Sequence, residues 1–138
     1  MKRILVVDDS ETVLSILKNE IDQHDDVVAI YAKNYKDDER NIHYYKNNIH
    51  AALLDINLPD AKNGEVISLA NLYNIPVIVL TALLSKEVRN TIHKMDIITY
   101  ILKNNKLSIK NTYILNTLYK EGEKDEHSYF ITSFSTKG

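Results

Sequence analysis

The sequence predicts an α/β fold, in which a doubly wound, five-stranded parallel sheet carries five helices on its two faces. First, apolar runs of strand length alternate along the chain with longer segments whose apolar residues recur at helical spacing. Second, several of these runs are continuous, which is typical of strands that are covered on both faces. Strands that alternate with helices indicate β-α-β units with right-handed crossovers, and therefore parallel strands.

Five apolar runs predict the strands. In chain order they are Ile4–Val7, Val27–Tyr31, Ala51–Leu54, Ile75–Leu80 and Ile97–Leu102. The segments between and after them predict helices. Ser10, Asn34 and Ser85 can each cap a helix that follows, Gly64–Tyr73 is a short third helix, and Leu107–Lys120 is the fifth. The acid-rich turn Asp37–Glu39 is interpreted as a solvated start of the second helix.

Composition and charge exclude several classes of protein. The chain has 138 residues, of which 44% are hydrophobic and 26% charged, as in an ordinary globular domain. A net charge of −2 gives no broad electrostatic attraction to nucleic acid or anionic membrane. The absence of cysteine excludes disulfides, thiol nucleophiles and cysteine-ligated metals. No apolar run approaches a signal peptide or a membrane span. We therefore expect a cytoplasmic domain with no direct nucleic-acid or membrane binding.

Residues 1–122 are expected to form one domain, followed by a polar linker or tail over residues 123–138. The tail contains a few aromatic residues but is too short to be a domain. Three alternatives stay open for it: an extension that packs on the body, a free end, or a connection to a further domain of a longer protein.

Ligands of doubly wound sheets bind beyond the carboxyl ends of the strands. The polar residues found there are Asp8 and Asp9 after the first strand, Asp55 after the third, Thr81 after the fourth and Lys103 after the fifth. Neighbouring carboxylates repel one another unless a cation is present, and an oxygen-only ligand set suits Mg²⁺ or Mn²⁺. A metal, a lysine and a hydroxyl around one nucleophilic carboxylate are the groups that phosphoryl transfer needs.

These residues, in this order, resemble the response-regulator receiver domains of two-component signalling, which include the single-domain chemotaxis regulators. The resemblance covers Lys2 to about Lys120. It implies a flavodoxin-like fold with strand order 2-1-3-4-5, and it identifies residues 1–122 as a receiver domain. The tail would then lead to an output domain that is missing from this sequence.

The resemblance also implies a role for each site residue. Asp8 and Asp9 match the acidic pair that holds Mg²⁺, and Asp55 matches the phosphoacceptor. Asn57 matches the residue whose backbone carbonyl ligates the metal, so the implied metal ligands are Asp8, Asp9, Asp55 and Asn57.

The remaining matches concern the switch. Thr81 resembles the switch hydroxyl, Lys103 the invariant lysine, and Tyr100 the aromatic switch residue. Asn57 and Leu83 stand at the positions that flank the approach of water to the phosphoryl group.

Three positions depart from the family pattern. Asn104 follows Lys103 where the family usually has proline, often after a cis bond. The loop from Pro59 to Gly64 is one residue longer than usual. Asp96 stands where a glycine often ends the fourth helix, and aspartate adopts the left-handed conformation of such an end more readily than most residues.

The resemblance implies a signalling switch and no turnover of a substrate. A histidine kinase or phosphotransfer protein would phosphorylate Asp55 in a reaction that depends on Mg²⁺, with Mn²⁺ as a substitute. Phosphorylation would change the surface of the fourth helix, fifth strand and fifth helix, which would contact an output domain or target protein. A homodimer through that surface is also open.

Two other functions stay open. One is an interaction module that works without phosphorylation, which the Asn104 departure favours. The other is a phosphohydrolase with an aspartyl nucleophile, as in haloacid-dehalogenase-like enzymes. Those enzymes carry a second carboxylate two residues after the nucleophile, where this chain has Asn57.

Overall fold

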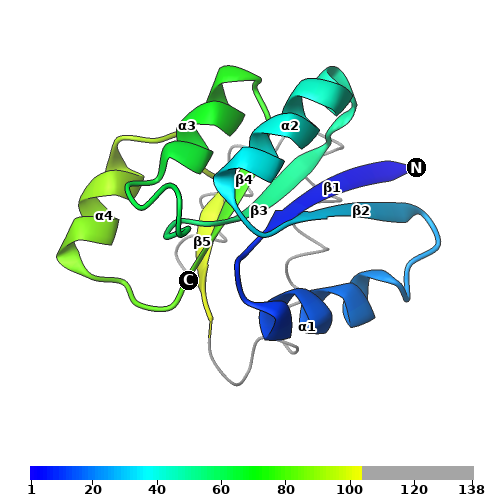
Figure 1. Cartoon of the computed structure of the whole chain (residues 1–138), viewed down its shortest axis with the longest axis horizontal. Helices are drawn as coiled ribbons and strands as arrows, with labels where there is room; N and C mark the ends of the chain where they lie inside the picture. Colours follow the sequence, from blue (N-terminus) through cyan, green and yellow to red (C-terminus); the bar gives the residue numbers. More distant parts are fainter. Residues whose placement is uncertain (104–138) are drawn as a thin grey trace.

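The computed structural model describes residues 1–103, which form a parallel five-stranded sheet with the order β2-β1-β3-β4-β5 (Figure 1). The strands are β1 (Lys2–Val7), β2 (Val27–Ala32), β3 (Ala51–Asp55), β4 (Val77–Thr81) and β5 (Thr99–Leu102). The flavodoxin-like α/β fold, all five predicted strands and their predicted order are confirmed. The connection from β2 to β3 passes β1, so the strand order reverses between β1 and β3, which is where sites form in such sheets.

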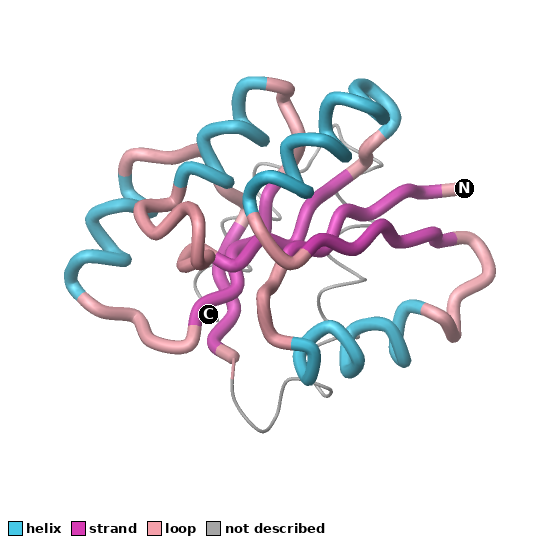
Figure 2. The backbone as a smooth tube through the Cα atoms, in the orientation of Figure 1, coloured by secondary structure: helices cyan, strands magenta, loops and turns pink. Residues whose placement is uncertain are grey.

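Four α-helices and a short 3-10 helix lie between the strands (Figure 2). They are α1 (Glu11–Ile21), α2 (Tyr35–Tyr45), η1 (Lys46–Asn48), α3 (Glu65–Leu72) and α4 (Lys86–His93). The predicted caps are confirmed, because the side chains of Ser10, Asn34 and Ser85 each accept a backbone N–H bond of the helix that they precede. The predicted fifth helix, Leu107–Lys120, and the tail 123–138 lie outside the described residues.

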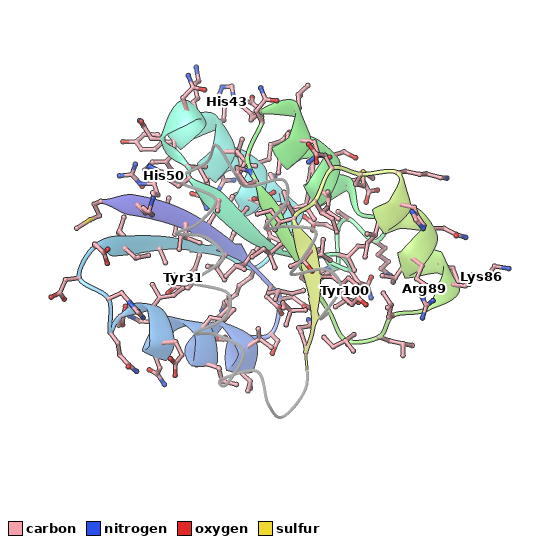
Figure 3. The ribbon with its side chains drawn as sticks, turned by 180° about the vertical axis from the view of Figure 1, so that it is seen from behind. Tyr31, His43, His50, Lys86, Arg89 and Tyr100 are labelled. Atoms are coloured by element: carbon pink, nitrogen blue, oxygen red, sulfur yellow. The ribbon has the colours of Figure 1, made fainter. Side chains whose placement is uncertain are left out.

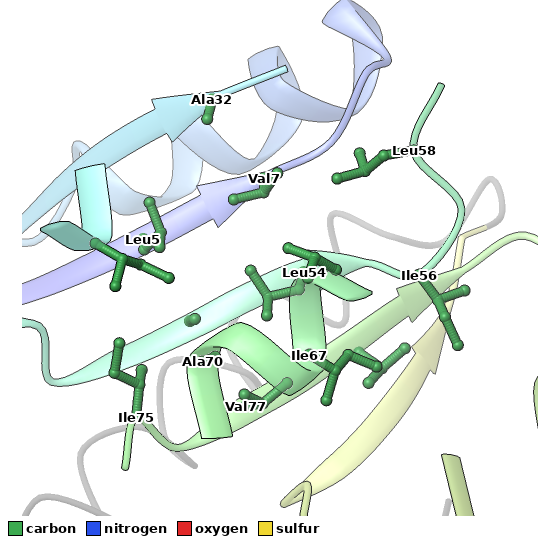
Figure 4. Close-up of a cluster of buried hydrophobic side chains, with 14 of the residues drawn as sticks. Leu5, Val7, Ala32, Leu54, Ile56, Leu58, Ile67, Ala70, Ile75 and Val77 are labelled. Atoms are coloured by element: carbon green, nitrogen blue, oxygen red, sulfur yellow. The ribbon is translucent and has the colours of Figure 1, made fainter. Parts of the chain in front are cut away.

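Two apolar clusters fill the space between the sheet and its helices. On one face, Leu14 and Leu17 of α1 pack against residues of the strands such as Leu53. On the other face, α2 and α3 cover a second cluster, in which Leu54 and Ile67 are fully buried (Figure 4). Because both faces are covered, the central strands are continuous apolar runs, as the sequence indicates.

The start of β4 differs from the prediction. Ile75 takes part in the turn that closes α3, because its N–H donates to the carbonyl of Ala70 at 3.0 Å. Asn74 before it adopts a left-handed φ of 57°. This is a common way to close a helix, and it delays the strand until Val77.

Asp96 does not take the left-handed conformation considered for the end of α4. Within residues 1–103, the only residues other than glycine with positive φ are Lys46 and Asn74. Instead, the Asn71 side chain fixes this turn. It donates to the Asp96 carbonyl at 2.8 Å and accepts from the Asp96 N–H at 3.0 Å. Hydrogen bonds from a side chain therefore hold this turn without a left-handed residue.

No helix of the described residues has both the length and the hydrophobicity needed to cross a membrane.

One acidic side chain of α2 is buried without a partner, which contradicts the interpretation of Asp37–Glu39 as solvated. Asp38 is completely buried, and neither carboxylate oxygen has a hydrogen-bond partner among the residues that the structure describes. Burial, and to a smaller extent the charge of Glu39, raises the pKa of Asp38 to about 7. The folded protein therefore holds a proton here that the unfolded chain loses at lower pH.

We expect the free energy of unfolding to decrease as the pH rises from about 4 to about 8, because the folded state binds this extra proton over that range. Asp38→Asn and Asp38→Leu should remove the part of the decrease that Asp38 causes, up to roughly 4 kcal/mol. A smaller decrease from Asp55, whose pKa burial also raises, should remain in these variants. Denaturant unfolding at pH 5 and pH 8 measures it. The control is Asp25→Asn, which removes one charge at an exposed site. Equal pH dependence in Asp38→Leu and Asp25→Asn would contradict this assignment.

Candidate functional site

The sheet brings the predicted site residues to one edge. Asp8, Asp55 and Thr81 are all buried there, at the carboxyl ends of β1, β3 and β4. Lys103 follows β5, and its N–H donates to the Thr81 carbonyl at 2.8 Å, which continues the strand pairing by one residue. Asp9 lies beside Asp8 but is exposed to solvent. Residues separated by up to 95 positions in sequence therefore meet at one site.

Lys103 bridges two of the carboxylates. Its Nζ lies 3.0 Å from Asp8 Oδ2 and 3.1 Å from Asp55 Oδ2. Backbone N–H groups hold the other oxygens: Ser10 donates to Asp8 Oδ1 at 2.8 Å, and Asn57 donates to Asp55 Oδ1 at 2.9 Å. Both carboxylates are thus fixed in orientation by one side-chain bond and one backbone bond.

The charges of this site do not balance. Burial raises the pKa of Asp55 to about 6, and the charge of Asp8 adds to the rise, while the Asn57 N–H and Lys103 oppose it. Burial works against the Lys103 ammonium, but its hydrogen bonds to Asp8 and Asp55 and their charges outweigh burial and raise its pKa. One ammonium group therefore faces two buried carboxylates and a third, exposed one.

The three carboxylates are arranged to share a cation. One oxygen each from Asp8, Asp9 and Asp55 lies within 4.8 Å of the others. Oxygen ligands without nitrogen or sulfur suit a hard divalent cation, and the unbalanced negative charge favours one. The residues present therefore fit the metal that the sequence predicts.

A cavity of about 470 Å³ opens beside Asp55. Its walls include the predicted residues Asp9, Asn57, Thr81, Leu83 and Lys103. Leu83 is 69% exposed, so its side chain is not packed beneath α4. Each of these residues therefore lies where it can meet a group bound to Asp55.

Thr81 and Tyr100 lie on the same side of the sheet. The Thr81 Oγ1 donates to the Leu83 carbonyl at 3.0 Å. Tyr100 pairs with Val79 in the register of β4 and β5, two residues before Thr81, and it is half-buried (Figure 3). Its ring packs against the same apolar cluster as Val88 and Ile92 of α4. Tyr100 and α4 thus border one apolar cluster on this face of the sheet.

Sequence reasoning missed several residues of the cavity wall. Lys62 and Asn63 line it from the loop between β3 and α3, and Glu87 and Thr91 line it from α4. The extra residue in the loop between β3 and α3 was the only feature of the sequence that pointed to these residues of the cavity wall. The peptide between Lys103 and Asn104 lies at the limit of the described residues, so the missing proline has no structural account.

The family comparison agrees with this geometry. The sequence model described as the response regulator receiver domain matches residues 4–111, and the chain therefore belongs to that family. No curated protein matches the chain.

Solved structures of receiver domains are similar throughout the fold. The response regulator domain of Thermotoga maritima CheB is 19% identical with a TM-score of 0.76, covering 91% of this chain and 98% of that one. The Mn²⁺-bound form of response regulator Rcp1 is 22% identical with a TM-score of 0.73, covering 90% and 96%. A probable two-component system response regulator/GGDEF domain protein is 26% identical with a TM-score of 0.71; the match covers 86% of this chain but 48% of that longer one.

We expect Asp9→Ala to abolish Mg²⁺ binding, because it removes the only exposed carboxylate of the cluster while leaving the buried Lys103 bridge intact. Isothermal titration with MgCl₂ or amide shifts near Asp55 would measure this. Asp25→Ala, at an exposed site outside the cluster, is the matched control and should bind as the wild type does. Unchanged binding in Asp9→Ala would place the metal elsewhere.

Proposed function

We propose that this chain is a phosphoryl-accepting switch of a two-component system, in which Asp55 takes a phosphoryl group from a histidine kinase or phosphotransfer protein. The observation that carries the proposal is the Lys103 bridge to Asp8 and Asp55 inside a three-carboxylate cluster, at the mouth of an open cavity. Membership of the receiver family supports it.

The nucleophile is prepared by its hydrogen bonds. The Asn57 N–H and Lys103 hold the two oxygens of Asp55, so the carboxylate is fixed in orientation before the donor arrives. An oxygen of Asp55 attacks the phosphorus in line, the bond from phosphorus to the donor nitrogen breaks, and its electron pair leaves with the imidazole.

Charge neutralisation comes from two sources. Mg²⁺, held by Asp8, Asp9, Asp55 and the Asn57 carbonyl, would balance the negative charge of the phosphoryl oxygens when bound, and Mn²⁺ would serve as a substitute. The Rcp1 structure with Mn²⁺ supports a divalent cation in this family. Lys103 already contacts Asp55 Oδ2, so its ammonium can pair with a phosphoryl oxygen on that carboxylate.

The switch would begin at Thr81. Its hydroxyl donates to the Leu83 carbonyl here, and a phosphoryl group on Asp55 offers a more strongly charged acceptor. Movement of Thr81 would free space that Tyr100 can fill, and Tyr100 borders the same apolar cluster as Val88 and Ile92 of α4. The change would thus reach the surface of α4 and β5, which joins the predicted fifth helix.

This surface would carry the signal onward. We infer that residues 1–122 form the receiver domain in the cytoplasm, that residues 123–138 are a polar linker or tail that leads to an output domain, and that the surface contacts that domain or a target protein. The GGDEF-containing relative supports an attached output domain. A homodimer through α4, β5 and the fifth helix is the other use of the surface. Asp55 would turn over only its own phosphoryl group, so the domain is not an enzyme.

Incubation with acetyl phosphate and Mg²⁺ should add one phosphoryl group to Asp55, because the site holds a fixed carboxylate, a cation cluster and an open approach. Intact-protein mass spectrometry measures the addition, and Asp55→Asn should show none. If the wild type stays unmodified with every donor and still binds its partner, the interaction module without phosphorylation is the correct function. Steady release of phosphate from an ester substrate would favour the phosphohydrolase.

We expect Leu83→Asn to shorten the lifetime of phosphorylated Asp55 by about three- to tenfold, because a polar side chain on the cavity wall can orient an attacking water that leucine keeps away. The phosphorylation rate should change less. Decay of the modified protein after removal of the donor measures the effect. Leu72→Asn is the matched control, since Leu72 is similarly exposed on α3 but does not line the cavity. Equal lifetimes in all three proteins would exclude a role for Leu83.

A further inference from the structure

The loop between β3 and α3 presents a lysine to the phosphorylation cavity. Lys62 lines this cavity together with Asp55 and Leu83. Within residues 1–103, its side chain has no hydrogen bond or ion pair with another residue. It therefore faces the cavity as an uncommitted cation.

The segment that carries Lys62 is held firmly on both sides. Before it, Leu58 and Ala61 exchange backbone hydrogen bonds of 3.2 and 3.1 Å, and both side chains are buried. Asp60 caps α2, accepting from the Tyr35 N–H at 2.8 Å and the Lys36 N–H at 3.2 Å. These contacts fix where the loop lies relative to the sheet.

The segment after Lys62 is also held. The Asn63 N–H donates to Glu65 Oε1 at 2.9 Å. Gly64 has a φ of 77°, and a Cβ there would lie 2.8 Å from Thr91 Cγ2 of α4. A side chain at this position would be strained, so glycine suits this close approach of the loop to α4. Lys62 lines the cavity from the same loop.

Lys103, the other positively charged side chain at the cavity, already has ion-pair partners. Among the described residues that line it, the cations are Lys62 and Lys103, and Lys103 is bonded to Asp8 and Asp55. The acidic residues that line the same cavity are Asp9, Asp55 and Glu87. An anion leaving this cavity would therefore meet mainly negative charge, with Lys62 as the available positive group.

In-line attack places the leaving group on the side of the phosphorus away from Asp55, toward the open side of the cavity. About 470 Å³ is more than a phosphoryl group alone needs, so the leaving group fits within the same walls. The charge of that group depends on the donor. An acyl phosphate releases a carboxylate anion, whereas a phosphoramidate releases a neutral amine.

We propose that Lys62 is a specificity-determining residue that contacts the leaving group and favours acyl phosphates over donors with a phosphorus–nitrogen bond. The inference rests on the proposed phosphorylation of Asp55. Small acyl phosphates would thereby be efficient donors that need no kinase, while transfer from phosphohistidine would depend little on Lys62.

The two reactions differ in where the charge goes. With acetyl phosphate, the bond from Asp55 oxygen to phosphorus forms, the phosphorus–oxygen bond to the acetyl group breaks, and its electron pair leaves on acetate. With phosphoramidate, whose nitrogen is already protonated, the phosphorus–nitrogen bond breaks and its electron pair leaves on neutral ammonia. Lys62 can stabilise the developing charge of acetate but gains nothing from ammonia.

The test compares the two donors at saturating Mg²⁺ in the wild type, Lys62→Gln, Lys62→Arg and Lys86→Gln. Lys86 begins α4, extends away from the body of the molecule (Figure 3) and does not line the cavity, so it controls for the loss of one positive charge. We expect Lys62→Gln to slow phosphorylation by acetyl phosphate about three- to tenfold and by phosphoramidate less than about twofold. Lys62→Arg should keep most of the wild-type rate, and Lys86→Gln should change neither.

Each outcome separates this inference from the proposed function. Equal slowing with both donors, or an equal effect in Lys86→Gln, would overturn the role of Lys62 while leaving Asp55 as the phosphoacceptor. An unchanged acetyl phosphate rate in Lys62→Gln would do the same. A wild type that accepts a phosphoryl group from neither donor would overturn the proposed function, and the role of Lys62 with it.

Discussion

The whole arrangement depends on the ion bridge that Lys103 makes to Asp8 and Asp55. It connects the carboxyl ends of β1 and β3, which are neighbours in the sheet, with that of β5, which lies one strand beyond β3 across β4. Buried carboxylates are costly unless they are paired and hydrogen-bonded, and here each has one backbone N–H and a share of one ammonium. The bridge lowers the free-energy cost of burying these carboxylates in the folded protein. The negative charge that it leaves unbalanced favours a divalent cation.

The apolar core stabilises the folded state, whereas a site of buried charges does not. β1, β3 and β4 contribute fully buried residues to both clusters, so the strand ends that hold the carboxylates are rigid. α4 is different, since none of its residues is fully buried. A helix with few buried contacts moves at a low cost in free energy. The rigid strand ends therefore fix the geometry of the site, whereas α4 is held by fewer buried contacts than the other α-helices of residues 1–103.

The sequence predicts the position of a residue best where that position follows directly from the helix or strand that contains it. Asp8, Asp55, Thr81 and Lys103 were found because each ends a continuous apolar run, and strand ends of a parallel sheet share one edge. It fails where the fold overrides the local pattern. Ile75 is as apolar as a strand residue but closes α3, and Asp38 is as acidic as a helix start but is buried against the core. The cavity wall at Lys62 depends on where the fold places the β3–α3 loop, which the local sequence pattern does not specify.

That loop joins three regions of the molecule that the sheet alone leaves separate. Asn57 at its start bonds the Asp55 carboxylate, Asp60 caps α2, and Gly64 at its end lies against Thr91 of α4. A phosphoryl group that disturbed the bond between Asn57 and Asp55 would therefore act on a segment already fixed to α2. At its other end, the same segment meets α4 at the contact between Gly64 and Thr91. The loop therefore links the Asp55 carboxylate to α4 through residues other than Thr81 and Tyr100, and it meets a helix that has no fully buried residue.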